Sequence, residues 1–484
     1  MCDRERGWSE VPLDKTWQLI AGSAVAGLAL SLATVAAAGP WDSGQRKAER
    51  DRAASWSHTG GADHAAGGLP QAAPSAPGVL AGIGREPRPV PAGGPALAES
   101  LEPLLADRGL GDLRSAAVVD TATGQVLFES RAREAMTPAS TVKIATAAAA
   151  LAALGPEHRI RTTVVPGPGP GQIVLVGGGD PSLTAKKKAP AGSGGSLVAL
   201  AADTARALKA AGTDSVALGY DDSLYSGPAR HPIGVNDNIA PVTALMADEG
   251  RPDDSVSGPV ERSEDPAGDT ARAFAALLRE RGIKVTGDPA EATSPTGAKP
   301  LATTLSTPLG GLVERMLTNS DNDIAEALAR QTAVASGQPA SFEGGEKAVA
   351  ARLAALGVDV TGARFADGSG LARADRVTTA LLTSLLARSA DPRRPELRPV
   401  LTGLPVAGFS GTLRARNAGN SPAAGLVRAK TGTLSGVNAL AGTVVDPSGR
   451  LLAFAFLTAN SPDPAAAEKG LDKLAATVAG TSGP

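Results

Sequence analysis

Three short strings of polar residues stand far apart in this 484-residue sequence. They are Ser-Thr-Val-Lys at residues 140–143, Ser-Asp-Asn at 320–322 and Lys-Thr-Gly at 430–432. Together they supply a hydroxyl nucleophile, a lysine that can take its proton, a second hydroxyl beside an amide, and a lysine that can bind a carboxylate. If the fold brings them together, the chain has the groups for acyl transfer without a histidine.

The first string opens a strongly helical run, residues 141–154, which stops at Gly155 and Pro156. Ser140 is predicted at the helix N-terminus, with Lys143 one turn later on the same face. The positive end of the helix disfavours a charged ammonium nearby and favours negative charge on a reacting oxygen. Taken alone, this spacing is more typical of an ordinary helix cap with an exposed lysine.

The second string falls between two predicted helical segments, residues 312–317 and 324–335. Taken alone it is a capping box, because Ser320 and Asp323 have the Ser-x-x-Asp spacing. The same string can cap a helix and also take part in the chemistry of a site.

The third string is predicted on a β-strand, where side chains alternate between faces, so Lys430 and Gly432 share one side. Glycine at this point would let a peptide approach the backbone of an edge strand. Taken alone, the string is an exposed strand lysine followed by a turn glycine.

In this order the three strings resemble the active-site serine penicillin-recognising enzymes. The narrower resemblance is to the class C low-molecular-mass penicillin-binding proteins, the D-alanyl-D-alanine carboxypeptidases and endopeptidases of peptidase family S13. It covers roughly residue 96 to the C-terminus and is supported by four further strings: Gly-Gly-Asp-Pro at 178–181, Asp-Gly-Ser-Gly-Leu at 367–371, Arg-Val-Thr at 376–378 and Gly-Thr-Leu at 411–413.

The resemblance implies a role for each catalytic residue. Ser140 would attack the substrate, Lys143 would take its proton, and Ser320 would carry a proton to the leaving amine. Asn322 would hold Lys143 and the substrate amide by hydrogen bonds.

The resemblance also implies how substrate is bound. Lys430 and the hydroxyls of Thr431 and Thr433 would recognise a terminal carboxylate, and Gly432 would belong to the same binding strand. An oxyanion hole would use the backbone N–H groups of Ser140 and Thr433. Neither a metal nor a cofactor is implied.

The fold class implied is α/β (α+β), a penicillin-binding transpeptidase or β-lactamase-like antiparallel sheet flanked by helices, with an inserted second domain. Strands are predicted from both ends of the folded sequence, which suggests one sheet closed by the termini. They cover residues 116–119 and 125–128, with Gly124 in the turn between them, and 426–433, 439–445 and 451–457; a closing helix covers 465–479.

The long interval between the first two strings predicts the insertion. Residues 96–161 and 301–484 would form the catalytic domain, and residues 162–300 the inserted domain, which is too short to favour a third, nested domain. Its predicted elements are strands at 161–165, 172–176 and 215–219, and helices at 197–211 and 271–281.

The N-terminal part has a different character. We expect residues 1–16 to be a cytoplasmic tail, 17–38 a signal peptide or transmembrane anchor, and 39–95 a disordered linker rich in Pro, Gly and Ala. The uncharged run from Leu19 to Ala38 is long enough to cross a bilayer if it is not cleaved. Both alternatives predict an extracytoplasmic catalytic body in the cell envelope.

Composition excludes several other classes. The net charge of -2 and the 3% aromatic content disfavour a nucleic-acid partner. The single cysteine, Cys2, rules out an intramolecular disulfide. Four histidines without a His-Glu-x-x-His string, and no Gly-x-Ser-x-Gly elbow, disfavour a zinc peptidase and a Ser-His-Asp hydrolase.

These observations predict a serine-type D-Ala-D-Ala carboxypeptidase, with endopeptidase cleavage as a further family activity, acting on peptidoglycan stem peptides and acylated by β-lactams at Ser140. A serine β-lactamase is the first alternative, but the nearest match to its Glu-x-x-Leu-Asn string, Glu-Arg-Met-Leu-Thr at 314–318, precedes Ser320 instead of following it. An inactive wall-binding protein of the same fold is the second alternative. The presence of every expected catalytic side chain disfavours it.

Overall fold

The computed structural model describes residues 95–480 except for 191, 418–420 and 422. The predicted cytoplasmic tail, the apolar segment at 17–38 and nearly all of the predicted linker lie outside the described residues. Among the helices that are described, none combines the length and apolar character that crossing a bilayer requires.

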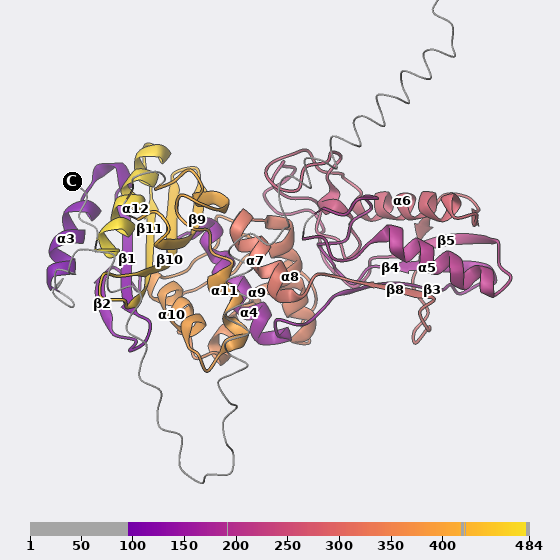
Figure 1. Cartoon of the computed structure of the whole chain (residues 1–484), viewed down its shortest axis with the longest axis horizontal. Coiled ribbons are helices and arrows are strands. Elements are labelled where there is room, and N and C mark those ends of the chain that lie inside the picture. The colour runs from indigo at the N-terminus through magenta and orange to yellow at the C-terminus, as the bar shows by residue number, and fades with distance from the viewer. Residues whose placement is uncertain (1–94, 191, 418–420, 422, 481–484) are drawn as a thin grey trace, which may run out of the picture. The chain divides into compact units, whose positions relative to one another are not determined.

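The first sheet has five antiparallel strands in the order β2-β1-β11-β10-β9 (Figure 1). The strands are β1 (Leu113–Asp120), β2 (Val126–Ser130), β9 (Val427–Leu434), β10 (Val437–Val445) and β11 (Leu451–Ala459). Gly124 turns the β1–β2 hairpin with a φ of 74°, a value that glycine adopts without strain. The predicted sheet, built from both ends of the folded sequence, is confirmed.

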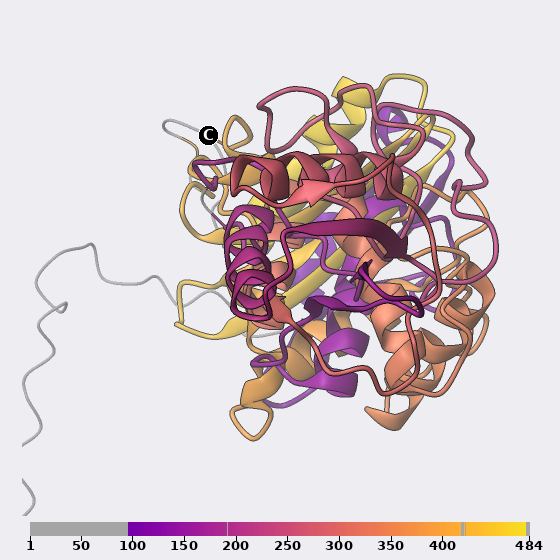
Figure 2. The same cartoon turned by 90° about the vertical axis from the view of Figure 1, so that its right-hand side faces the viewer.

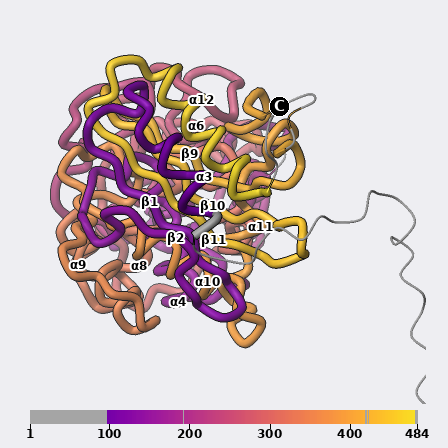
Figure 3. Tube along the Cα trace, turned by 90° about the vertical axis from the view of Figure 1, so that its left-hand side faces the viewer, coloured from indigo at the N-terminus to yellow at the C-terminus, as the bar shows by residue number. Residues whose placement is uncertain are grey.

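Helices α3 (Pro95–Leu105) and α12 (Pro464–Val478) cover one face of this sheet (Figure 3). The alternation of β11 divides its side chains between two cores: Phe454 and Phe456 pack beneath α12, whereas Ala455 and Leu457 point to the opposite face. Both faces of the central strands are therefore buried, which explains their continuous apolar sequence.

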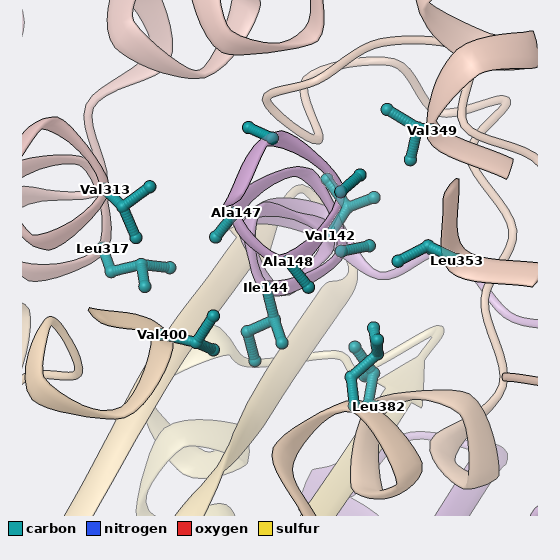
Figure 4. Close-up of a cluster of buried hydrophobic side chains, with 14 of the residues drawn as sticks. Val142, Ile144, Ala147, Ala148, Val313, Leu317, Val349, Leu353, Leu382 and Val400 are labelled. Carbon is teal, nitrogen blue, oxygen red and sulfur yellow. The ribbon is translucent and has the colours of Figure 1, made fainter. Parts of the chain in front are cut away.

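The opposite face carries a helical layer arranged around α4 (Lys143–Leu154). Its other members are α7 (Leu309–Asn319), α8 (Asn322–Ala335), α9 (Phe342–Ala355), α10 (Thr379–Ala390) and α11 (Pro399–Thr402). Figure 4 shows α4 end-on, with side chains such as Val313, Leu353 and Leu382 directed at it from its neighbours. Because α4 presents mainly alanines, those helices can approach it closely.

A second sheet is built from residues between the first two strings. Its order is β6-β5-β4-β3-β8, with β7 pairing β5, and it mixes parallel and antiparallel pairs. The strands are β3 (Arg161–Pro166), β4 (Gln172–Val176), β5 (Ser215–Asp221), β6 (Lys284–Val285), β7 (Ala290–Glu291) and β8 (Ala302–Leu305). The sequence predicted β3, β4 and β5 but not the three short strands.

Helices α5 (Leu197–Ala210) and α6 (Pro266–Glu280) contact each other and pack on one face of this sheet (Figure 2). Phe274 of α6 is completely buried at the centre of a core that is separate from the two cores of the first sheet. The sheet starts at Arg161 and ends at Leu305, a few residues outside the predicted limits of 162 and 300.

The close packing of α4 leads to a stability prediction. Ala147 is completely buried, so Ala147→Leu should lower the free energy of unfolding by about 1–3 kcal/mol, because no space exists for the added carbons. Ala153→Leu, a substitution at a half-buried position in the same helix, should cost much less. Urea denaturation of both variants measures the difference, and equal losses would contradict the packing described here.

Candidate active site

The three strings meet at one cleft. Lys143 Nζ lies 3.0 Å from Ser140 Oγ, and Lys430 Nζ donates to Ser320 Oγ at 2.9 Å. The cleft has a volume of about 460 Å³. Its walls include Ser140, Ser320, Asn322, Thr431 and Thr433 from the strings, and Ile233, Asn238, Arg251 and Arg262 from the region of the second sheet. The two lysines are completely buried behind this surface.

Ser140 stands on a short 3₁₀ turn, Ala139–Val142, that runs directly into α4. Ala139 has a φ of 48°, which is strained for a residue with a side chain. Two glycines pack against this turn: a Cβ at Gly370 would lie 2.1 Å from Ala139 O, and a Cβ at Gly432 would lie 2.7 Å from Pro138 O. Backbone contacts therefore hold the nucleophile turn in place.

The same geometry gives a structural reason for Gly432. The sequence suggested that glycine is needed there so that a substrate peptide can approach, and this stays a prediction. The position of its missing side chain is taken up by Pro138 O and the Cβ of Ala139. Any larger residue would push against the nucleophile turn, which packs on this face of β9.

Among the described residues, Lys143 Nζ donates to three acceptors. They are Ser140 Oγ at 3.0 Å, Asn322 Oδ1 at 2.7 Å and Ser369 O at 2.5 Å. Burial lowers the pKa of Lys143 from 10.5 to about 8, although nearby carboxylates, Asp367 foremost, oppose the change. A neutral amine has two N–H groups and one lone pair. If Asn322 and Ser369 accept both N–H groups, the lone pair faces Ser140.

The second string changes direction between two helices. Ser320 ends α7 in the left-handed conformation, with φ 59° and ψ 40°. Asp321 caps α8, because its Oδ1 accepts from Ile324 N at 3.0 Å. The predicted capping box is therefore wrong, since Asp321, not Ser320, is the cap. In this conformation the Ser320 hydroxyl accepts a hydrogen bond from Lys430. Asn322, the first residue of α8, accepts one from Lys143.

Lys430 is held between Ser320 and its own strand. Its Nζ donates to Ser320 Oγ and, at 2.8 Å, to Thr431 O. Burial, followed by the charge of Lys143, lowers the pKa of Lys430 well below its ordinary value. Lys430 therefore gives up its proton more readily than an exposed lysine does.

Strand β9 is the edge of its sheet, next to the cleft. Ala429 N donates to Pro405 O, away from β10. Since backbone groups on an antiparallel strand alternate in direction, the N–H groups of Thr431 and Thr433 also point away from β10. The sequence analysis gave no role to Thr412, yet its hydroxyl lies 2.9 Å from Thr431 Oγ1 and lines the cleft.

The Asp-Gly-Ser-Gly loop at 367–370 belongs to one of the four further strings that support the resemblance. Its contact with Lys143 through Ser369 O was not predicted. Despite burial, hydrogen bonds from His231 and Asp375 lower the pKa of Asp367 to about 2. Burial, followed by the charge of Asp367, raises the pKa of Asp375 to about 10. The two shifts place the negative charge on Asp367 and keep Asp375 protonated near neutral pH.

In the part of the chain that the structure describes, two clusters of side chains have the composition of metal ligands: His231, Glu326 and Asp367, and Glu249, Asp321 and Asp323. Protein groups already contact both of them. Glu326 and Asp367 accept backbone N–H groups of the 367–370 loop, whereas Arg251, Arg262 and Arg315 pair with the second cluster. Cations of the protein itself therefore balance the second cluster.

Residues 97–261 and 252–478 match the sequence pattern of the D-Ala-D-Ala carboxypeptidase 3 (S13) family. The chain belongs to this family. Carboxypeptidase DacB of Mycolicibacterium smegmatis is 40% identical over 421 residues, which cover 83% of this chain and 88% of the relative. The D-alanyl-D-alanine carboxypeptidase of an Actinomadura species is 30% identical, covering 80% of this chain and 86% of the relative.

Penicillin-binding protein 4 of Haemophilus influenzae has the same fold, with a TM-score of 0.64 at 23% identity, covering 79% of this chain and 98% of that protein. The predicted family and fold class are confirmed. The protein is a serine peptidase of the S13 family.

The lowered pKa of Lys143 predicts the pH dependence of acylation. If neutral Lys143 is the base of this S13 peptidase, acylation by a fluorescent penicillin should accelerate from pH 6 to 9 with a midpoint near the pKa of about 8. At pH 7 roughly a tenth of the lysine is then neutral. Stopped-flow measurement of the second-order rate constant gives the profile.

Lys143→Arg is the control, because a guanidinium stays protonated and should leave acylation slow at every pH. A wild-type rate that still rises about tenfold per pH unit up to pH 9, as expected for a lysine with the ordinary pKa of 10.5, would contradict the role of burial.

Proposed function

We propose that this chain hydrolyses the D-Ala–D-Ala bond at the end of peptidoglycan stem peptides through an acyl-enzyme on Ser140. One observation carries the proposal: a buried amine, Lys143 Nζ, lies 3.0 Å from an accessible hydroxyl, with two further acceptors fixing its direction. Family membership supplies the substrate class.

In the first step Ser140 Oγ attacks the carbonyl of the penultimate D-Ala, and its proton passes to Lys143 Nζ. The carbonyl oxygen becomes negative within reach of the N–H groups of Ser140 and Thr433. Amide dipoles that are fixed before reaction stabilise such a charge without reorganisation. The orientation of the Thr433 N–H away from β10 supports this assignment.

The departing D-Ala needs a proton on its amine. Ser320 Oγ supplies it, because Lys430 Nζ lies 2.9 Å behind that hydroxyl and can pass a proton on. The proton that Lys143 took from Ser140 then restores Lys430, so Lys143 is neutral again. Water attacks the acyl-enzyme, Lys143 takes a proton from the water, and that proton returns to Ser140 Oγ as its bond to the acyl carbon breaks. Every step uses side chains of this chain.

Substrate binds along the free edge of β9 as an added strand. The hydroxyls of Thr431 and Thr433 bind the terminal carboxylate, and the amine of Lys430 lies behind them. The contact between Thr412 and Thr431 orients the Thr431 hydroxyl. β-Lactams occupy the same place because they imitate the D-Ala–D-Ala end.

The substrate fixes where the protein acts. Peptidoglycan lies outside the cytoplasmic membrane, so residues 17–38 serve for export or as an anchor, and residues 39–95 tether the catalytic body. We assign residues 96–161 and 301–484 to the catalytic domain and 162–300 to the inserted domain. The separate core of the second sheet supports this division.

A serine β-lactamase of class A would need a glutamate that activates the deacylating water. The nearest sequence match begins at Glu314, on α7, whose carboxylate accepts a hydrogen bond from Thr402. Glu314 does not line the cleft. The carboxypeptidase assignment is favoured for this reason.

The direct test compares wild type with Ser140→Ala. The wild type should release D-Ala from a D-Ala-D-Ala peptide and retain bound fluorescent penicillin for minutes or longer, whereas Ser140→Ala should do neither. Lys143→Ala should slow acylation by about 10³-fold, because general-base assistance is lost.

Ser384→Ala, a substitution on α10 outside the cleft, is the matched control and should behave as wild type. Penicillin labelling that survives in Ser140→Ala would remove Ser140 from its role. Rapid turnover of penicillin by the wild type would identify a β-lactamase instead.

A further inference from the structure

A ten-residue segment of the inserted region, residues 231–240, lies at the cleft, whose wall includes Ile233 and Asn238. His231 begins the segment and is 3% exposed. Its Nε2 lies 2.9 Å from Asp367 Oδ2, and its Nδ1 accepts from Ile233 N at 3.1 Å. Because Nδ1 is an acceptor, the proton of a neutral ring is on Nε2, and His231 donates to Asp367.

Asp367 also accepts hydrogen bonds from the loop that follows it. Its carboxylate accepts from Ser369 N at 3.0 Å, Gly370 N at 2.6 Å and Ala372 N at 2.7 Å. These bonds fix the peptide whose carbonyl, Ser369 O, accepts from Lys143 Nζ. His231 is therefore joined to one acceptor of Lys143 through a single carboxylate.

The other end of the segment holds the second acceptor. Asn322 Nδ2 donates to Asn238 O at 3.0 Å, which sets the amide so that its Oδ1 faces Lys143. Ala240 N donates to Asp323 Oδ1 at 2.9 Å, beside Asn322 at the start of α8. Asn238 and Ala240 thus fix Asn322 from the side away from the lysine.

We propose that residues 231–240 aim the lone pair of Lys143 at Ser140, with His231 as a positioning residue that acts through Asp367 and Ser369. The inference rests on the proposed role of Lys143 as base. A neutral amine can donate to only two acceptors. Since one short segment holds both of them, it selects the orientation in which the lone pair meets the serine hydroxyl. This gives the insertion a part in catalysis.

Several titratable groups lie near Lys143, and their charges affect the pH dependence of acylation. They are Asp367 and Asp375 from the 367–375 loop, Glu326 from α8, Asp321 at its N-cap, and Lys430 from β9. Losing the His231 contact releases Ser369 O, which removes an acceptor from the ammonium form of Lys143. The midpoint of acylation should therefore move to lower pH while the rate falls.

Two amide substitutions separate positioning from packing in the full-length chain. Glutamine can bring an N–H group to the place of His231 Nε2, whereas asparagine is too short. We expect His231→Gln to acylate within about threefold of wild type, and His231→Asn to be slower by about 10- to 100-fold, because misplacement of a reacting group has effects of that size. His158→Asn, at a half-buried histidine outside the cleft, is the control.

Acylation by fluorescent penicillin is measured from pH 6 to 9, with the labelled fraction at completion and the melting temperature for each variant. A positioning role predicts full labelling of His231→Asn at a lower rate and a lower midpoint. A packing role alone would reduce the labelled fraction and leave the midpoint unchanged, and it would overturn the proposal. So would a folded His231→Asn as fast as wild type, or a folded His231→Gln as slow as His231→Asn.

If His231→Asn does not fold, Asn238→Pro tests the other end. Proline still has a backbone carbonyl at position 238, but it lacks the N–H that donates to Asn236 Oδ1. The turn therefore changes, and the carbonyl that Asn322 contacts moves. A wild-type rate and midpoint in this variant would overturn the proposal. Failure of the wild type itself to be acylated, or labelling that persists in Ser140→Ala, would contradict the proposed function rather than this inference alone.

Discussion

The site depends on keeping a lysine amine out of water. Lys143 is completely buried, and the lowering of its pKa from 10.5 to about 8 corresponds to roughly 3 kcal/mol against the charged form. Desolvation alone would lower the pKa further, but the surrounding carboxylates offset part of the effect. The result is an amine that is neutral often enough to act as a base and charged often enough to return a proton.

This balance requires a rigid surrounding. The turn that carries Ser140 includes a strained Ala139, and Ser320 is left-handed, so neither conformation would persist without support. Support comes from the buried helix α4 on one side and from glycine contacts on the other. Strand β9 and helix α8 bring the second lysine and the amide to the same point. The strain is thus stored where the nucleophile and proton carrier must be placed.

The sequence predicted the parts of the fold that have a local signal. Short runs of apolar residues marked β1, β10 and β11, and helical periodicity marked α4, α5 and α12, with ends that differ from the structure by a few residues. The two-residue strands β6 and β7 carry no recognisable pattern, because their position depends on pairing with β5. The bounds of α9 and α10 were also not predicted.

The site was predicted as three strings, and all three meet. What could not be predicted were the contacts made through backbone or across the insertion. Ser369 acts through its carbonyl, which any residue possesses, so its identity gave no signal. His231 was a lone histidine, and only the fold brings it to Asp367. The capping interpretation of Ser320 was wrong because the Ser-x-x-Asp spacing cannot show that Ser320 is left-handed and that Asp321 caps the helix.

The central claim is that burial makes Lys143 a base near neutral pH. Heteronuclear NMR titration of the lysine side chains tests it most directly, with the Lys143 resonance assigned by its absence from the Lys143→Arg variant. The account predicts a titration midpoint near 8, well separated from the exposed lysines. A Lys143 resonance that titrates with them near 10.5 would contradict it.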